Sequence, residues 1–269
     1  MIEALQFEFM RNALLAGLLV SIACGVIGTL VVVNRLVFLA GGIAHATYGG
    51  IGLALFLGIP YIAGTLGVAL IAALIMAVVS LKAKHRADTI IGVIWAVGMA
   101  AGIILVDLTP GYNVDLMGFL FGAILTVPRS DLWQMLVICM AQVVIVAYYY
   151  NDFLAMSYDS EFARLRSIPV GWLYFLLLGM IALSVVIIIR VVGLILVIAL
   201  LTIPPYIAEK YTRSLAAMMA LSTILSCLFT TAGLGLAYWL DLTSGATIIL
   251  VAAAGFLISM AVERLRTKH

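Results

Sequence analysis

About nine long apolar runs constrain this chain more strongly than any other feature of its sequence. Each run holds roughly 20 residues, the length that an α-helix needs to cross the hydrocarbon core of a bilayer. Charged residues make up only 10% of the chain, and the mean hydropathy is +1.28. The sequence therefore predicts an all-α polytopic membrane protein whose spans cover residues 12–33, 36–57, 62–81, 88–107, 130–150, 170–189, 191–208, 214–238 and 244–262.

A shorter apolar segment lies at residues 116–127, directly before Pro128. Its roughly 12 residues fall short of the about 17 that a crossing needs. Treating it as a full crossing would also place basic loops on conflicting sides of the membrane. We therefore expect a short re-entrant helix here, within a single transmembrane domain over residues 1–269.

The 14 lysine and arginine residues indicate the orientation of the chain, because such residues are retained on the cytoplasmic side. With the N-terminus outside, the inner side holds Arg35, Lys82, Lys84, Arg86, Arg164, Arg166, Lys210, Arg213, Arg264, Arg266 and Lys268, and the outer side only Arg11, Arg129 and Arg190. This asymmetry predicts an outside N-terminus and a cytoplasmic C-terminus in an inner, plasma-type cell membrane.

Acidic residues outnumber basic ones on the predicted outer side. These acids are Glu3, Glu8, Asp107, Asp115, Asp131 and Asp241. Such a face attracts cations weakly, although loop acids also simply keep loops soluble. The chain has no basic patch with interleaved aromatic residues, so nucleic acid is not an expected partner.

One histidine, His45, lies in the middle of an apolar span that holds no other ionisable residue. Gly41, His45, Gly49 and Gly52 are spaced four, four and three residues apart, so they share one face of a helix. An ionisable group at that depth is a candidate functional residue, and the glycines would line a pathway beside it. The alternative is a core histidine satisfied by a neighbouring carbonyl, among glycines that only allow close helix packing.

Several classes of chemistry find no support in the sequence. It has no GxxxxGK[ST], HExxH or GxSxG motif, so nucleotide hydrolysis or a familiar hydrolytic site is not expected in this chain. The scarcity of intramembrane acids disfavours a proton- or sodium-driven carrier. Cys24, Cys139 and Cys227 lie in apolar spans without CxxC spacing, which indicates a role in packing. An intramembrane enzyme could use Cys24 together with His45, but the sequence shows no paired acid for such a site.

Two inner loops have patterns that suit contact with a partner protein. Residues 151–169 read NDFLAMSYDSEFARLRSIP, which predicts a polar segment, a cap at Asp159 or Ser160, and a short helix over residues 161–166. Residues 203–214 contain Pro204 and Pro205, which we expect to break the helix at the membrane surface. Both segments could equally be solvated loops.

Four segments together resemble the permease subunits of ABC importers for zinc, manganese and iron. They are VVVNRLVFLAGGIAHATYGGIGLALFLG (31–58), ADTIIGVIWAVGMAAGIILV (87–106), DLMGFLFGAILTVPRSDLW (115–133), and VVGLILVIALLTIPPYIAEKYTR (191–213) followed by LDLTSGATIIL (240–250). The resemblance covers nearly the whole chain. It implies a type II importer-like permease fold of about nine transmembrane helices plus the re-entrant helix.

The resemblance also implies a set of partners and contact residues. The permease would pair with a second copy of itself, a cytoplasmic ABC ATPase dimer and an extracytoplasmic metal-binding protein, within the lipid bilayer. The residues implied to contact the ATPase are Asp159, Glu161, Ala163 and Arg164 in the first inner loop, and Glu209 and Arg213 in the second. Family members usually carry a glycine where this chain has Ser167.

His45 matches the histidine of the family's GDALxHA-type motif, but its surroundings depart from that motif. The acid of the motif falls on Gly41, and a proline that follows falls on Gly49. Asp107, Asp115 or Asp241 would then have to attract the ion at the outer side. The pattern indicates a variant branch of the family.

These observations lead to one main hypothesis. The chain would import a divalent transition metal ion that His45 ligates transiently, with no permanently bound cofactor and no enzymatic activity of its own. An ABC importer for a chelated metal or cofactor, or a stand-alone secondary metal carrier, are the alternatives. Metal uptake with and without ATP separates the last of these from the others.

Overall fold

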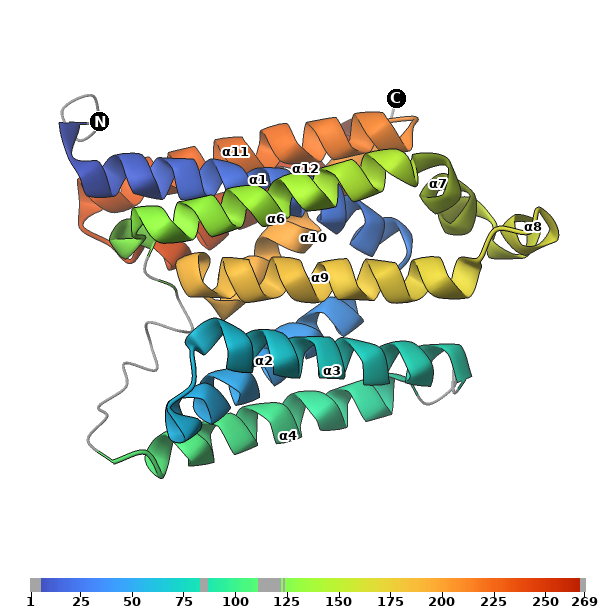
Figure 1. The fold of residues 1–269 in the computed structure, drawn as a ribbon. Helices are drawn as coiled ribbons and strands as arrows, with labels where there is room; N and C mark the ends of the chain where they lie inside the picture. The colour runs from blue at the N-terminus through green and yellow to red at the C-terminus, as the bar shows by residue number, and fades with distance from the viewer. Residues whose placement is uncertain (1–5, 83–86, 111–121, 123, 267–269) are drawn as a thin grey trace. The chain divides into compact units, whose positions relative to one another are not determined.

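The structure, a computed structural model, describes residues 6–82, 87–110, 122 and 124–266, and the elements in these ranges are all helical. Nine of the described helices are long and apolar enough to cross a membrane, which confirms the predicted number of spans. They are α1 (Glu8–Val33), α2 (Val37–Leu57), α3 (Tyr61–Lys82), α4 (Ala87–Asp107), α6 (Arg129–Tyr148), α9 (Val170–Val192), α10 (Leu194–Tyr211), α11 (Leu215–Leu240) and α12 (Ser244–Arg266) (Figure 1). Three shorter elements are η3 (Ile124–Thr126), α7 (Tyr150–Tyr158) and α8 (Ser160–Leu165). Most of the predicted re-entrant segment, residues 116–127, lies outside the described residues.

The chain forms two compact units. Unit 1 comprises Met1–Val32, Met117–Ile145 and Ile188–His269, and unit 2 comprises Val33–Leu116 and Val146–Ile187. Unit 1 therefore holds α1, most of α6, α10, α11 and α12. Unit 2 holds α2, α3, α4, α7, α8 and most of α9.

Glycines set the spacing of the helices in unit 2, where α2 packs against both α3 and α4 (Figure 1). A Cβ atom at Gly50 of α2 would lie 2.6 Å from the carbonyl oxygen of Gly64 in α3. One at Gly49 would lie 2.8 Å from the carbonyl oxygen of Gly98 in α4. Both distances are shorter than van der Waals contact, so α2 lies backbone to backbone against its two neighbours.

Unit 1 uses small and hydroxyl-bearing residues in a similar way. A Cβ atom at Gly25 of α1 would lie 2.7 Å from the Cα atom of Thr223 in α11. One turn along α1, the Ser21 hydroxyl lies 3.4 Å from the Thr230 hydroxyl, and both residues are buried. These contacts hold α1 and α11 close together through polar as well as apolar packing.

The prediction that Pro204 and Pro205 break the helix at the membrane surface is wrong. Both prolines lie inside α10, which continues to Tyr211. Proline removes a backbone donor, so the carbonyl groups of Leu200 and Leu201 lose their usual helix hydrogen bonds. Gly28 of α1 lies against this point, since a Cβ atom there would be 2.7 Å from the Leu201 carbonyl oxygen. Close packing of α1 thus supports the helix where the prolines weaken it.

The first inner loop contains two helices rather than one. Its second part forms α8, and Asp159 rather than Ser160 caps it by accepting hydrogen bonds from the backbone N–H groups of Glu161 and Phe162 at 3.0 and 2.9 Å. The segment before it, which we expected to be a polar loop, forms α7. Phe153 and Met156 lie three residues apart on one face of α7 and are both buried, which explains why this polar sequence folds as a helix.

The start of α6 is attached to α1. Glu8 and Arg129 form an exposed ion pair at 2.7 Å, and the Asn12 side chain donates a hydrogen bond to the Val127 carbonyl at 3.1 Å. Asp131 is buried. Two of the six predicted outer acids, Glu8 and Asp131, are therefore engaged in local structure rather than free to attract cations.

Candidate functional site around His45

Helix α2 positions His45 near its middle, eight residues after the helix begins at Val37. Trp95 lies eight residues after the start of α4 at Ala87. The two helices run in the same direction, because Gly42 lies against Ile91 and Gly52 lies against Gly102. His45 and Trp95 are therefore at the same level of two adjacent parallel helices.

The rings of His45 and Trp95 are in contact. Their centroids lie 3.8 Å apart, and their planes are nearly perpendicular at 86°. Each residue is half-buried. An edge-to-face contact of this kind restricts the rotation of both rings, so Trp95 orients the imidazole.

One nitrogen of this imidazole has no partner within the described residues. The Nδ1 atom of His45 is buried and makes no hydrogen bond there. A buried polar atom without a partner costs about 1–3 kcal/mol, so folding alone does not explain its presence. Neutral imidazole is a ligand for divalent transition metals, which makes His45 the candidate ligand of this helix.

The described residues contain no cluster of three or more side chains that could hold a metal ion around His45. Among residues 6–82, 87–110, 122 and 124–266, no three His, Cys, Asp or Glu side chains lie close enough together to hold a metal ion. A single imidazole per chain would bind a metal ion only weakly.

The three predicted pathway glycines are all buried in α2. Gly49 and Gly52 lie against Gly98 and Gly102 of α4, so close packing within unit 2 requires both. Whether Gly41 or the others also line a pathway stays a prediction.

Of the three acids predicted to attract the ion, Asp107 is the one that lies in the same unit as His45 within the described residues. Asp107 is exposed at the end of α4, 12 residues beyond Trp95, or about 18 Å along the helix axis. Asp241 belongs to unit 1, where it ends α11 in a left-handed conformation with φ of 54°. Asp115 lies outside the described residues. Asp107 cannot share an ion with His45 of the same chain.

The first predicted ATPase-contact segment presents a mixed surface. Asp159, Glu161 and Arg164 are exposed, whereas Ala163 is fully buried within unit 2. In Figure 1, α8 extends past the N-terminal end of α9. Its two large apolar side chains point outward, since Phe162 is 52% and Leu165 is 85% exposed.

The first inner loop is also tied to the start of α2. The Asn34 side chain donates a hydrogen bond to the Ser157 hydroxyl of α7 at 2.9 Å. The next residue, Arg35, has a left-handed backbone with φ of 59° and leads directly into α2. This hydrogen bond joins the segment that carries α8 to the helix that carries His45.

The second predicted contact segment lies at the end of α10. Glu209 and Arg213 are both exposed there, and the connection to α11 is short because Ser214 already caps the next helix. Neighbouring residues of this segment, Lys210 and Tyr211, contact α12.

Sequence reasoning missed Trp95, Phe162 and Leu165. Trp95 could have been found, because the predicted spans place it at the same depth as His45 once α2 and α4 are assigned the same direction. The outward orientation of Phe162 and Leu165 required knowledge of which face of α8 is buried, and six residues are too few to show a helical period.

The chain has relatives over nearly its whole length. It is 50% identical to an uncharacterized membrane protein of Synechocystis, covering 98% of this chain and 94% of that protein. It is 32% identical to the manganese transport system membrane protein MntC of Halalkalibacterium halodurans, covering 96% and 88%. Among solved structures, PsaBC from Streptococcus pneumoniae, determined in complex with Fab, matches with a TM-score of 0.87 at 30% identity, covering 96% of this chain and 93% of that one. Residues 6–263 match the ABC 3 transport family, and the chain belongs to that family.

Proposed function

We propose that this chain is the permease subunit of an ATP-driven importer for a divalent transition metal ion, with manganese as the first cargo to test. The family assignment and the manganese transport proteins among its relatives support this class of cargo. The observation that carries the proposal is the buried, unpaired nitrogen of His45 at the middle of an apolar helix. Burying an ionisable group at that depth costs free energy, and such a residue is therefore expected to have a functional role.

The proposed assembly contains two copies of the chain, two cytoplasmic ATPase subunits and an extracytoplasmic binding protein. The ion would pass between the two copies, where one imidazole from each can ligate it briefly. The absence of an acid at Gly41 leaves the site without a neighbouring carboxylate on α2. Weak binding by nitrogen alone would favour passage over retention.

The proposed orientation places the N-terminus outside and the C-terminus in the cytoplasm. The distribution of lysine and arginine along the loops supports this direction. The exposed face of α8, with Phe162 and Leu165, and the end of α10 then both lie on the cytoplasmic side. Apolar side chains exposed outside a membrane suit contact with a protein surface, so we assign them to the ATPase.

Transport by the reconstituted assembly tests this proposal. The permease, its ATPase and its binding protein would be placed in liposomes, and uptake of radioactive Mn²⁺, Zn²⁺ and Fe²⁺ measured with ATP and with ADP. Uptake that requires both ATP and the binding protein is expected. Uptake by the permease alone would instead identify a secondary carrier, and uptake of a metal chelate but of no free ion would identify a chelate importer.

A further inference from the structure

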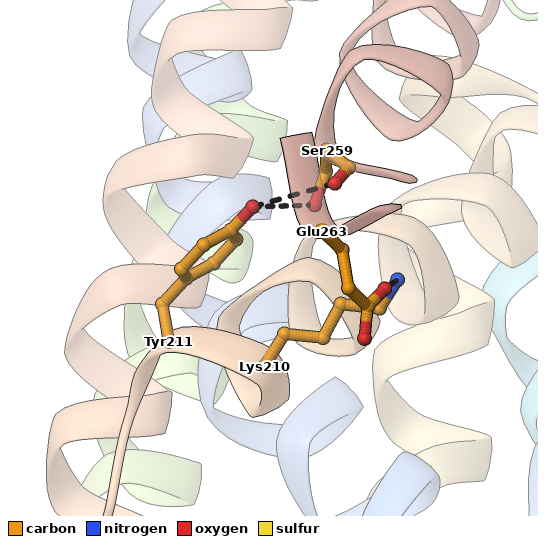
Figure 2. A network of polar contacts seen from close by, with 4 residues as sticks. All are labelled: Lys210, Tyr211, Ser259 and Glu263. Carbon is orange, nitrogen blue, oxygen red and sulfur yellow. Dashed lines mark hydrogen bonds and ion pairs between the residues drawn. The ribbon is translucent and has the colours of Figure 1, made fainter. Parts of the chain in front are cut away.

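Paired side chains join the C-terminal ends of α10 and α12 in unit 1 (Figure 2). The Nζ atom of Lys210 lies 2.6 Å from the Glu263 carboxylate. The hydroxyl group of Tyr211 lies 3.2 Å from the Ser259 hydroxyl and 3.4 Å from the Ser259 carbonyl oxygen. Figure 2 shows both pairs reaching from the end of one helix to the other.

An aromatic layer continues these contacts toward the start of α10. The rings of Tyr206 and Phe256 lie 5.6 Å apart, and the Lys210 ammonium lies 4.7 Å from the centre of the Tyr206 ring. Contact positions on α12 are spaced three and four residues apart, so they form one face. We refer to this set as the α10–α12 staple, which consists of Tyr206, Lys210, Tyr211, Phe256, Ser259 and Glu263.

The staple begins directly after the weakest point of α10. Pro204 and Pro205 remove the hydrogen bonds that would join them to the Leu200 and Leu201 carbonyl groups. Before the prolines, α10 is mostly buried and packs on α1 at Gly28. After the prolines, Ile207 and Ala208 are still buried, and the staple adds the polar and aromatic contacts that join this end of α10 to α12.

We propose that residues 206–211 and the second half of α12 move as one rigid lever that pivots at Pro204 and Pro205, with Lys210 and Glu263 as its positioning residues. This inference rests on the proposed function, because the lever would transmit movement of the ATPase to unit 1. Glu209 in the last turn of α10, and Arg213 in the connection that follows it, are the exposed residues through which the ATPase would move the lever. Prolines within helices are common sites of kinks.

The Lys210–Glu263 ion pair can be tested by exchanging its charges, because the exchanged pair still attracts. Lys210 and Glu263 occupy different helices, so repulsion between like charges would separate those helices. The Lys210→Glu and Glu263→Lys variants each create like charges, whereas the double variant restores an attractive pair. The Tyr206–Phe256 and Tyr211–Ser259 pairs keep their side chains in all three variants, whereas Lys210→Glu also removes the ammonium group from the Tyr206 ring.

The first test measures the number of Mn²⁺ ions imported per ATP hydrolysed by the full reconstituted transporter. Each single variant is expected to lower this ratio about fivefold, and the double variant to restore it to within about twofold of wild type. Lys82→Glu, an equal charge change at an exposed lysine of α3, should leave the ratio unchanged. Single variants with the wild-type ratio, or a double variant no better than the single ones, would overturn the proposal.

Tyr211→Phe provides a milder variant that preserves the ring and removes the hydroxyl group that contacts Ser259. It is expected to lower the ratio about twofold, while the amount of ATPase that copurifies with the permease stays unchanged. A purely structural role of Tyr211 would reduce the yield or the copurified ATPase and leave the ratio of ions to ATP unaltered.

A second test does not depend on transport. Spin labels at positions 209 and 265 of the full-length permease report the distance between the ends of α10 and α12. The lever predicts one narrow distance distribution in the wild-type background, a broad one with Lys210→Glu, and a narrow one again in the charge-exchanged double variant. Identical distributions in all three would contradict the lever, whereas failure of wild-type metal uptake would contradict the proposed function instead.

Discussion

Adding one methyl group to Gly52 tests the close packing of α2 on α4. A Cβ atom there would overlap the backbone of Gly102, with its Cα atom at 2.8 Å and its carbonyl carbon at 2.9 Å, where ordinary contact is 3.4–4 Å. No flexible side chain can move aside, because the opposing atoms belong to the backbone. In Gly52→Ala, α4 must therefore shift by roughly 0.5–1 Å, and overpacking of this kind costs about 1–3 kcal/mol.

The same substitution at Gly67 of α3 and Gly92 of α4 isolates this packing cost. An added Cβ atom at either position would meet nothing within 4 Å. All three variants gain the same helix propensity, about 1 kcal/mol for glycine to alanine, so the difference between them reports the packing alone.

Thermal unfolding of the purified permease in detergent measures the difference. Gly67→Ala and Gly92→Ala should unfold at or above the wild-type temperature. Gly52→Ala should unfold several degrees below them, since about 1 kcal/mol corresponds to roughly 2–4 °C in a chain of this size. If Gly52→Ala were as stable as the two control variants, the backbone contact between α2 and α4 would be refuted.

Three further substitutions test the first inner loop. Asp159→Ala removes the cap of α8 and should destabilise that helix by about 1 kcal/mol, with less ATPase retained on purification, whereas Asp159→Asn should retain the cap and the ATPase. Asn34→Ala and Ser157→Ala should each lower the free energy of unfolding by about 1 kcal/mol. If the two side chains interact, the double variant should lose no more than either single variant, whereas additive losses would show that they do not interact. Ser167→Gly should raise the unfolding temperature, because Ser167 has φ of 60° and glycine relieves about 1 kcal/mol of strain there; a lower temperature would contradict that reasoning.

The apolar runs were sufficient to predict the spans, because a bilayer excludes unpaired backbone groups and leaves helices of fixed minimum length as the solution. Two predictions from local sequence were wrong, one from polarity and one from proline. The sequence of α7 is polar enough to read as a loop, and only the burial of Phe153 and Met156 within unit 2 makes it helical. The two prolines predicted a break in α10, because local sequence does not show that α1 packs against this point of the helix at Gly28.

The candidate site was predicted only in part, for a similar reason. A lone histidine in an apolar span is visible in the sequence, and so is the glycine stripe that it shares. The residues that contact His45 and the glycine stripe are not visible in the sequence, because helical spacing identifies a face but not the helix that covers it. Contact with Trp95, and the use of Gly49 and Gly52 in packing on α4, depend on the parallel arrangement of α2 and α4.

The role of His45 in metal passage is tested most directly by ATP-driven Mn²⁺ uptake with wild-type permease and His45→Ala in the same reconstituted transporter. We expect the initial rate to fall at least about tenfold in the variant, while ATPase retention and thermal stability stay close to wild type. Trp95→Phe, which retains an aromatic ring beside position 45, should reduce the rate less. An unchanged rate of Mn²⁺ uptake in His45→Ala would contradict the account.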